Sequence, residues 1–280
     1  MRWRLLESGY ADGPTNMAVD EALLWSVAAG LAPTTLRLYG WEPPAVSLGY
    51  FQAVEGQVDR AEIARRGWGL VRRPTGGRAI LHHHEVTYSV VIAASALERG
   101  DSTMGSYREL SRGLELGLQR LGLAAALGET LADPAHRDSA KTLPAVCFAQ
   151  AGRGDLVAEG RKVVGSAQVR REGTILQHGS VPITLDLADQ IAVMPGPRDR
   201  PESQEGLARA ARGIGELLER PLSFAELSAA LVLGFTEAFG VTLEPAPLTA
   251  AEAEKASELR ATKYATDAWN LCPPQRGRAR

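Results

Sequence analysis

The chain has 280 residues, of which 45% are hydrophobic, 6% aromatic and 23% charged, the composition of a globular protein and not of a disordered or fibrous one. This length is enough to bury a substantial core in one large domain. The formal net charge of −2 gives no overall field toward DNA, RNA or an anionic membrane, so neither a nucleic acid nor a membrane is an expected partner.

Residues 1–13 contain no apolar core of signal-peptide length, and no later stretch approaches about eighteen uninterrupted apolar residues. We therefore expect a cytoplasmic protein. The two cysteines, Cys147 and Cys272, have no spacing that suggests a disulfide framework, and each is treated as a free thiol.

The first half of the chain alternates helical and strand-like segments. Residues 15–29 have the pattern of a helix that Thr15 or Asn16 caps, and the pair Ser106/Glu109 has the form of a capping box opening a helix to about residue 121. Apolar and β-branched runs predict strands at 34–41, 45–50, 68–73, 79–82 and 86–93, with a short helix at 58–66.

From residue 155 the pattern becomes a meander of three strands, at 155–159, 162–170 and 174–183. Each of the two short joins carries a glycine, as tight hairpin turns require. After residue 187 the chain turns helical, and Ser223/Glu226 and Thr249/Glu252 have the form of capping boxes.

These elements predict an α/β (α+β) fold in which a mixed, largely antiparallel sheet is flanked by helices and the C-terminal third is helical. We expect residues 1–270 to form a single domain and residues 271–280 a loose tail. The stretch 195–204, which has three prolines, is the segment we expect to be most flexible.

The first segment with the composition of a site runs from Arg72 to His82, as a strand, a double-glycine turn and a second strand. Gly76 and Gly77 let the backbone approach a ligand closely, while Arg72, Arg73 and Arg78 supply fixed charge for a phosphate or carboxylate. An ordinary hairpin with solvated arginines is the alternative.

Lys162 is unusual because the chain uses lysine at only four positions among 31 lysines and arginines. A lysine kept beside Arg161 and between apolar residues indicates a need that arginine cannot meet, such as loss of a proton or a compact ammonium in a tight site. Codon bias with a few lysines left by chance is the alternative.

Cys147 lies between Val146 and Phe148, where a buried cysteine is most often an inert apolar residue. A nucleophile needs the thiolate, and a nearby ammonium that lowers the thiol pKa by about one to two units would raise the reactive fraction severalfold. Lys162, fifteen positions later, is a candidate for that charge. Cys272 has no comparable context.

Three consecutive histidines, His82 to His84, precede Glu85. On a strand at most two of them share a face, and there is no second cluster with ligand spacing, so we expect no metal site. One histidine lining a pocket is the preferred interpretation. His178, on the last strand of the meander, either faces the same pocket or is an ordinary core histidine.

Taken together, these motifs resemble the biotin/lipoate A/B protein ligase family. The segment from Arg72 to His82 is similar to its signature strand–turn–strand, and the segment 159–168 to its lysine-bearing hairpin. The Val-Cys-Phe at 146–148 resembles the octanoyltransferase branch, as do the runs 38–41, 47–52, 175–179 and 262–270. The likeness covers nearly the whole chain and implies a fold of the class II biotin/lipoyl synthetase type.

The resemblance implies that Cys147 is the acyl-thioester nucleophile and that Lys162 lowers its pKa and assists proton transfer. It also implies a substrate site bordered by Gly76, Gly77, Gly165 and Ser166, with Arg73 and His82 close by. One position departs from the family pattern, since His83 stands where an aspartate is expected.

The implied reaction moves an octanoyl group from octanoyl-acyl carrier protein, through the cysteine thioester, to the lysine of a lipoyl-domain protein such as glycine cleavage protein H. Thioester exchange followed by aminolysis needs no ATP and no cofactor, and it divides one difficult step into two. A neutral attacking amine would be favoured by a positive, water-poor pocket near Lys162. We expect the chain to act as a monomer.

Three alternatives remain. An ATP-dependent lipoate–protein ligase would use the lysine to contact an acyl-adenylate and would need no cysteine. A non-catalytic lipoyl- or acyl-binding protein would form no covalent adduct. A cysteine hydrolase would pair Cys147 with His82 or His178.

Both implied partners are similar to small acidic proteins. Docking on a local basic surface is therefore expected, formed by Arg72, Arg78, Arg161, Arg170 and Arg171.

Overall fold

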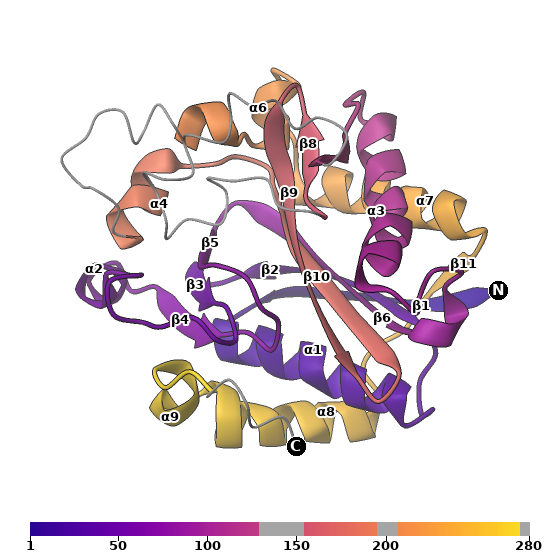
Figure 1. The fold of residues 1–280 in the computed structure, drawn as a ribbon, viewed down its shortest axis with the longest axis horizontal. Helices are drawn as coiled ribbons and strands as arrows, with labels where there is room; N and C mark the ends of the chain where they lie inside the picture. Colours follow the sequence, from indigo (N-terminus) through magenta and orange to yellow (C-terminus); the bar gives the residue numbers. More distant parts are fainter. Residues whose placement is uncertain (129–153, 195–206, 275–280) are drawn as a thin grey trace.

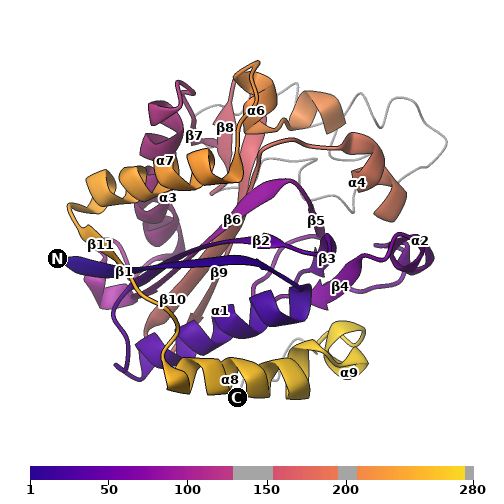
Figure 2. The same ribbon diagram turned by 180° about the vertical axis from the view of Figure 1, so that it is seen from behind.

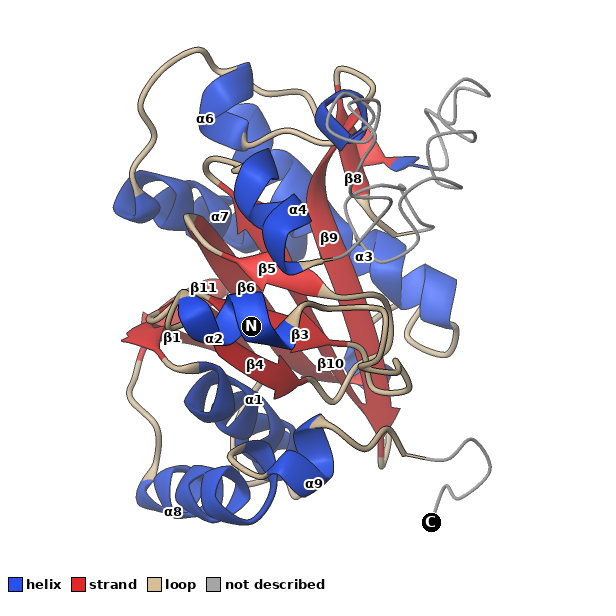
Figure 3. Cartoon of the chain, turned by 90° about the vertical axis from the view of Figure 1, so that its left-hand side faces the viewer, coloured by secondary structure: helices blue, strands red, loops and turns tan. Residues whose placement is uncertain are grey.

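The computed structural model of the protein describes residues 1–128, 154–194 and 207–274. In these residues the strands form one eight-stranded and one three-stranded sheet, and helices cover both faces of the larger sheet (Figures 1 and 3). The predicted fold, a mixed and largely antiparallel sheet flanked by helices, is confirmed. None of the described helices is long and apolar enough to cross a membrane.

The larger sheet has the strand order β11-β1-β2-β6-β10-β9-β8-β7. Strand β1 pairs in parallel with both β2 and β11, and all other neighbours in this sheet are antiparallel. Its strands are β1 (Arg2–Ala11), β2 (Thr35–Trp41), β6 (Glu85–Ala93), β7 (Ala126–Leu127), β8 (Leu156–Ala158), β9 (Arg161–Arg171), β10 (Thr174–Pro182) and β11 (Thr242–Pro245).

The predicted meander is present as β8, β9 and β10. Both of its turns have two consecutive residues with positive φ, 51° and 73° at Glu159-Gly160 and 49° and 72° at Glu172-Gly173. Two positive φ angles in a two-residue hairpin turn match the right-handed twist of the strands. The turns thereby fix the register that places Gly165 of β9 opposite Ser180 of β10.

The small sheet carries the double-glycine segment at its end. It has the order β4-β3-β5, formed by β3 (Ala45–Leu48), β4 (Gly69–Arg72) and β5 (Ile80–His82). Helices α2 (Arg60–Arg65) and α4 (Leu187–Val193) contribute to its core, in which Ile63, Leu81 and Val193 are buried. The predicted strands at 68–73 and 79–82 therefore lie in this sheet, separated by the glycine turn.

Two pairs of helices cover the larger sheet on opposite sides (Figure 2). Helices α1 (Gly13–Ala28) and α8 (Ala250–Leu259) lie on one face, and α3 (Thr103–Arg120) and α7 (Phe224–Phe239) on the other. Side chains of β2 alternate between these layers, since Leu36 and Leu38 pack with α3 and α7, whereas Tyr39 and Trp41 pack with α1. The remaining short elements are η1 (Ala94–Ala96), α6 (Ile214–Leu217), the π-helical turn η6 (Arg260–Tyr264) and α9 (Asp267–Asn270).

The N-terminal end of the first helix differs from the prediction. Asp12 caps α1 by accepting the backbone N–H of Thr15 at 2.8 Å, so the helix begins at Gly13 and neither Thr15 nor Asn16 is its cap. The preceding strand β1 and the edge strand β11 were not predicted. Both pair in parallel with a distant segment, and local sequence does not report such a pairing.

The predicted capping box at Ser106/Glu109 is wrong. Helix α3 begins one turn earlier, where Ser102 accepts the N–H of Gly105 at 2.9 Å. Glu109 instead accepts the backbone N–H groups of Glu98 and Arg99. Of the other two predicted boxes, Thr249/Glu252 makes both reciprocal bonds. At Ser223/Glu226 the serine cap forms, while the Glu226 carboxylate pairs with Arg220.

Helices α3 and α7 approach so closely that their contact depends on glycine. A Cβ on Gly234 would lie 2.2 Å from the carbonyl oxygen of Gly113 and 2.3 Å from the nitrogen of Gly117, both backbone atoms.

Gly234→Ala is therefore expected to lower the free energy of unfolding by about 1–3 kcal/mol, although alanine favours an isolated helix. Leu233→Ala, at an exposed neighbour in α7, should change it far less. Urea unfolding of both variants checks this, and equal stabilities would contradict it.

Candidate functional site

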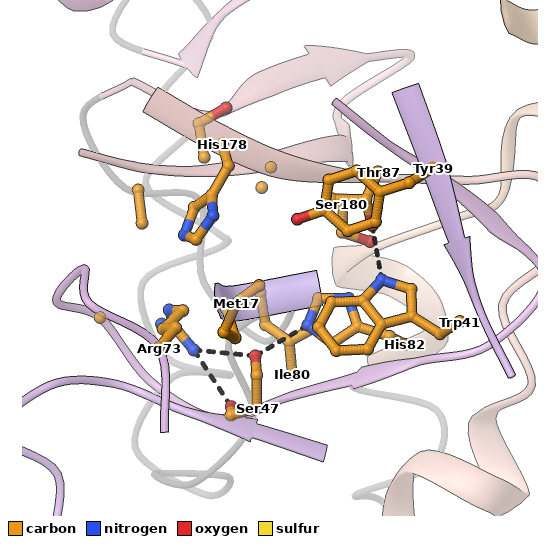
Figure 4. A pocket seen from close by; sticks show the side chains of 15 residues that line it. Met17, Tyr39, Trp41, Ser47, Arg73, Ile80, His82, Thr87, His178 and Ser180 are labelled. Atoms are coloured by element: carbon orange, nitrogen blue, oxygen red, sulfur yellow. Dashed lines mark hydrogen bonds between the residues drawn. The ribbon is translucent and has the colours of Figure 1, made fainter. Parts of the chain in front are cut away.

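A pocket lies between the small sheet and the middle of the larger sheet (Figure 4). Its cavity volume is about 40 Å³, and one side is open to solvent. Met17, Tyr39, Trp41 and Ile80 form apolar walls. Five of the predicted site residues line it as well: Arg73, Gly77, His82, Gly165 and Ser166. The glycine turn and the β9–β10 hairpin, far apart in sequence, therefore contribute to one site.

Arg73 holds the glycine turn in shape. Its guanidinium donates to the carbonyl oxygens of Gly76 at 2.7 Å and of Arg78 at 2.8 Å. Gly77 has a φ of +97°, and a Cβ on Gly49 would lie 1.9 Å from the carbonyl oxygen of Gly77. The rim of the pocket thus needs glycine at both positions, and Arg73 supports it through backbone contacts. Gly76 itself borders a separate, more open hollow.

Arg72, the neighbour of Arg73, is completely buried. Its guanidinium donates to the carbonyl oxygens of Gly49 and Gln52, each at 2.7 Å, and of Asn270 at 2.9 Å. Burial lowers the pKa of Arg72. The expectation that Arg72 belongs to a basic docking surface is wrong, because its charge serves to join the loop after β3 to α9.

A chain of three side chains, Ser47, His82 and Glu85, borders the pocket. Nδ1 of His82 lies 2.8 Å from a carboxylate oxygen of Glu85, and Nε2 lies 2.7 Å from Oγ of Ser47. The carboxylate accepts hydrogen bonds, so Nδ1 carries the hydrogen and Nε2 accepts from the serine hydroxyl. Trp41 stacks on the imidazole at a centroid distance of 4.0 Å and an interplanar angle of 10°, which fixes the plane of the ring.

A second chain of the same kind joins Thr75, His178 and Asp20. Nδ1 of His178 lies 2.8 Å from Asp20, and Nε2 lies 2.7 Å from Oγ1 of Thr75. Burial lowers the pKa of His178, although Asp20 acts in the opposite direction. Burial also tends to raise the pKa of Asp20, but the Arg37 guanidinium, 2.7 Å away, together with His178 holds it below the ordinary value. His178 thus faces the same pocket as His82, which decides between the two interpretations of that residue.

Lys162 is buried beside a carboxylate. Only 1% of its surface is exposed, and Nζ lies 2.7 Å from Oδ2 of Asp155, which is itself buried. Oδ1 of Asp155 accepts the backbone N–H of Ser166, a residue of the pocket. A bulge between β8 and β9 interrupts the pairing beside Lys162 and lets both Val163 and Val164 enter the core under α3 and α7. The lysine is therefore a fixed, desolvated cation and not a surface charge.

Cys147 lies outside the residues that the structure describes. The described residues on either side of that segment are close together, since the N–H of Gly128 donates to the carbonyl oxygen of Asp155 at 2.9 Å. The chain therefore leaves and re-enters the described structure beside the partner of Lys162. Cys272 is exposed.

Sequence reasoning did not identify Ser47, Trp41, Asp20 or Glu85 as residues of the site. Glu85 directly follows the three histidines, and a carboxylate three positions after His82 was the clearest sign in the sequence of a partner for that imidazole. The carboxylate of Asp20, in the second turn of α1, is completely buried. Residues of this type become recognisable only when the strands bring them together.

His83, the residue that departs from the family pattern, faces away from this pocket. Its ring stacks on His84 at 3.7 Å, and Nδ1 lies 3.5 Å from Asp189. Burial lowers the pKa of His83, and the neighbouring His84 acts in the same direction. Among the described residues no three histidine, cysteine or acidic side chains are grouped so that they could hold a metal ion.

Residues 12–236 match the model of the lipoyl protein ligase A/B catalytic domain. The chain is 45% identical to octanoyltransferase LipM of Symbiobacterium thermophilum over 271 residues, which covers 96% of this chain and 98% of that protein. It is 38% identical to octanoyltransferase LipM of Bacillus subtilis, with 96% and 97% covered. Both alignments therefore cover almost the whole of this chain and almost the whole of each relative.

Among solved structures, the chain is similar to the bi-partite lipoate protein ligase of Thermoplasma acidophilum. The TM-score is 0.82, the sequences are 25% identical, and the alignment covers 100% of both chains. The fold and the arrangement of its elements are thus shared along the full chain.

The buried His178–Asp20 pair makes stability depend on pH. Because the folded-state pKa of His178 is lowered, the unfolded chain binds more protons below a pH of about 6.5, and stability falls as the pH drops through that range. His178→Asn is expected to be less stable than the wild type near pH 7.5 but to lose less stability on going to about pH 5.5. Urea unfolding at several pH values measures both slopes. Parallel slopes would contradict the assignment.

Proposed function

Because the chain belongs to the lipoyl protein ligase A/B catalytic domain family, we infer that it is an octanoyltransferase of protein lipoylation, like the relatives it matches over nearly their whole length. The pocket carries this inference in the structure. Its apolar walls suit an acyl chain, and its open side is bordered by the glycine turn, where backbone can approach a reacting carbonyl closely.

We propose octanoyl-acyl carrier protein as the donor and a lipoyl-domain protein, such as glycine cleavage protein H, as the acceptor. Both present their reactive group on a long flexible arm, a thioester in one case and a lysine in the other. A narrow pocket beneath a rim of glycine backbone suits such arms better than a folded surface. Of the basic residues expected to form a docking surface, Arg78 and Arg161 remain candidates, because Arg170 donates to the carbonyl oxygens of Gly100 and Ser102 and Arg171 pairs with Glu21.

In the proposed mechanism the Cys147 thiolate attacks the carbonyl carbon of the donor thioester, and the carrier leaves as a thiolate that takes up a proton. The lysine amine of the acceptor then attacks the new thioester. An amide forms, the Cys147 thiolate leaves, and the amine gives up its proton to a base. Neither half requires ATP, because one thioester replaces another and amide formation from a thioester is favourable.

Lys162 supplies the positive charge that this mechanism needs beside a thiolate. Since its ammonium is already bonded to Asp155, the buried pair and not an isolated cation acts on the thiol. The proposal is supported by the burial of Lys162 and by the described chain ends that flank the cysteine segment, which meet beside Asp155.

An ATP-dependent lipoate–protein ligase is the second candidate, and the structural likeness to a lipoate protein ligase favours it. A non-catalytic acyl-binding protein is the third. The three differ in what they leave on the protein, since only the octanoyltransferase acquires an acyl group on a cysteine without ATP.

Mixing the protein with octanoyl-acyl carrier protein, without ATP, is expected to add the mass of one octanoyl group to Cys147. Intact mass spectrometry and peptide mapping detect it. Cys147→Ser should abolish the addition, whereas Cys272→Ser, at the exposed cysteine, should leave it unchanged. A transfer activity that survives Cys147→Ser would contradict the thioester mechanism.

Variants of the Lys162–Asp155 pair separate its structural role from its catalytic role. Lys162→Met leaves the Asp155 carboxylate buried without its ammonium and is expected to cost about 3–5 kcal/mol of stability. The double variant Lys162→Met/Asp155→Asn should regain most of that stability. Its rate of octanoyl transfer at neutral pH should still be roughly tenfold to a hundredfold below that of the wild type, because the pKa of the Cys147 thiol is no longer lowered by about one to two units. Thermal unfolding and initial rates measure the two effects. A stable double variant with normal activity would remove Lys162 from the mechanism.

A further inference from the structure

The Glu85 carboxylate is buried in the site without a permanent cation beside it. It is 4% exposed, and its hydrogen-bond partners among the described residues are the hydroxyls of Thr87 and Ser180 and the imidazole of His82. Burying a carboxylate is costly unless a positive charge compensates it. At this site His82 is the group placed to acquire that charge.

The second chain differs in this respect. Asp20 is bonded to the guanidinium of Arg37 at 2.7 Å as well as to His178, so its negative charge is already compensated. A proton added to His178 would leave a net positive charge in a fully buried position. A proton added to His82 would instead neutralise Glu85. The two chains have the same connectivity, but only in that of His82 would an added proton offset the charge of a carboxylate that pairs with no described arginine or lysine.

The hydroxyl of Ser47 connects this imidazole to the pocket. Ser47 and His82 both line the pocket, whereas Thr75, the corresponding hydroxyl of the second chain, is not among its lining residues. Arg73 donates to Oγ of Ser47 at 3.2 Å, so the serine hydrogen is left for Nε2 of His82, 2.7 Å away. Figure 4 shows Ser47 between the Arg73 and His82 side chains.

We propose that Ser47, His82 and Glu85 form a proton relay that takes the proton released when the acceptor amine attacks the acyl group. Oγ of Ser47 accepts a proton from the attacking nitrogen while its own proton passes to Nε2 of His82. The imidazolium that forms is stabilised by Glu85 and then returns the proton to solvent. No oxidant, metal or nucleotide takes part. The proposal rests on the proposed function and adds Ser47 as a catalytic residue in direct contact with the amine.

Groups of opposite charge lie on either side of the His82 imidazole. The Glu85 carboxylate is bonded to Nδ1, and the Arg73 guanidinium donates to Ser47, which is itself bonded to Nε2. Trp41 covers one face of the ring and excludes water there.

The test separates the two half-reactions. Single-turnover acylation by octanoyl-acyl carrier protein is compared with transfer from the isolated octanoyl enzyme to a lipoyl domain, for Ser47→Ala, His82→Asn and Glu85→Gln. We expect the second half-reaction to slow by roughly a hundredfold in Ser47→Ala and His82→Asn, and the first to change less than about threefold. The defect should shrink as the pH rises, because hydroxide in the solvent then competes with the relay for the proton of the attacking nitrogen. Ser228→Ala, which removes a buried hydroxyl in α7 far from the pocket, controls for loss of a hydroxyl alone.

Equal slowing of both half-reactions, or a defect that does not depend on pH, would mean that the three residues only hold the pocket in shape. Nitrogen NMR of the histidine rings gives a readout that needs no turnover. Nε2 of His82 should take up a proton reversibly in the folded enzyme, at lower pH in Glu85→Gln than in the wild type. A ring that never does so overturns the relay, even if the variants are poorly folded. Failure of the wild type to form the octanoyl enzyme would count against the proposed function, and the relay would then be judged by NMR.

Discussion

The site depends on two adjacent buried guanidinium groups that bind backbone carbonyl oxygens. Arg73 closes the glycine turn by bonding to Gly76 and Arg78, and Arg72 joins the loop after β3 to the C-terminal helix α9. A buried charge is tolerated only when its hydrogen-bonding groups are satisfied, and arginine offers five donors in a fixed plane. Neither residue is interchangeable with lysine. A loop between two edge strands thereby becomes a rigid rim, against which a flexible substrate arm can be held.

Within that rim the site contains three buried ionic arrangements that differ in how charge is balanced. Lys162 pairs with Asp155 and Arg37 with Asp20, while the hydrogen-bond partners of Glu85 in the described part of the chain are two hydroxyls and an imidazole. A balanced pair is a stable fixed dipole, whereas an unbalanced carboxylate favours a neighbour that can take a proton. The proposed acyl transfer would use both kinds of arrangement, a fixed charge pair and a group that accepts a proton during attack by the amine.

Much of this could be predicted from the sequence, because the informative signals are local. The single glycine in each turn of the meander predicted the hairpins, and the rarity of lysine pointed to Lys162. The signals that failed depend on distant contacts. Ser102 caps α3 in place of Ser106 because Glu109 bonds back to the preceding turn. Arg72 looked like a surface charge, but its acceptors are the loop 49–52 and residues 269–270, nearly two hundred positions away. Ser47 reaches the pocket through strand pairing, and Asp20 reaches His178 through the packing of α1.

The central claim is that the protein moves an octanoyl group between two carrier proteins through an enzyme thioester. The most direct measurement combines purified enzyme, octanoyl-acyl carrier protein and a lipoyl domain in nucleotide-free buffer, and follows the mass of the lipoyl domain. The domain is expected to gain one octanoyl group on its lysine, with initial-rate patterns that are parallel in the two substrates, as a covalent enzyme intermediate requires. A domain that is modified only when ATP and free octanoic acid are supplied would contradict it.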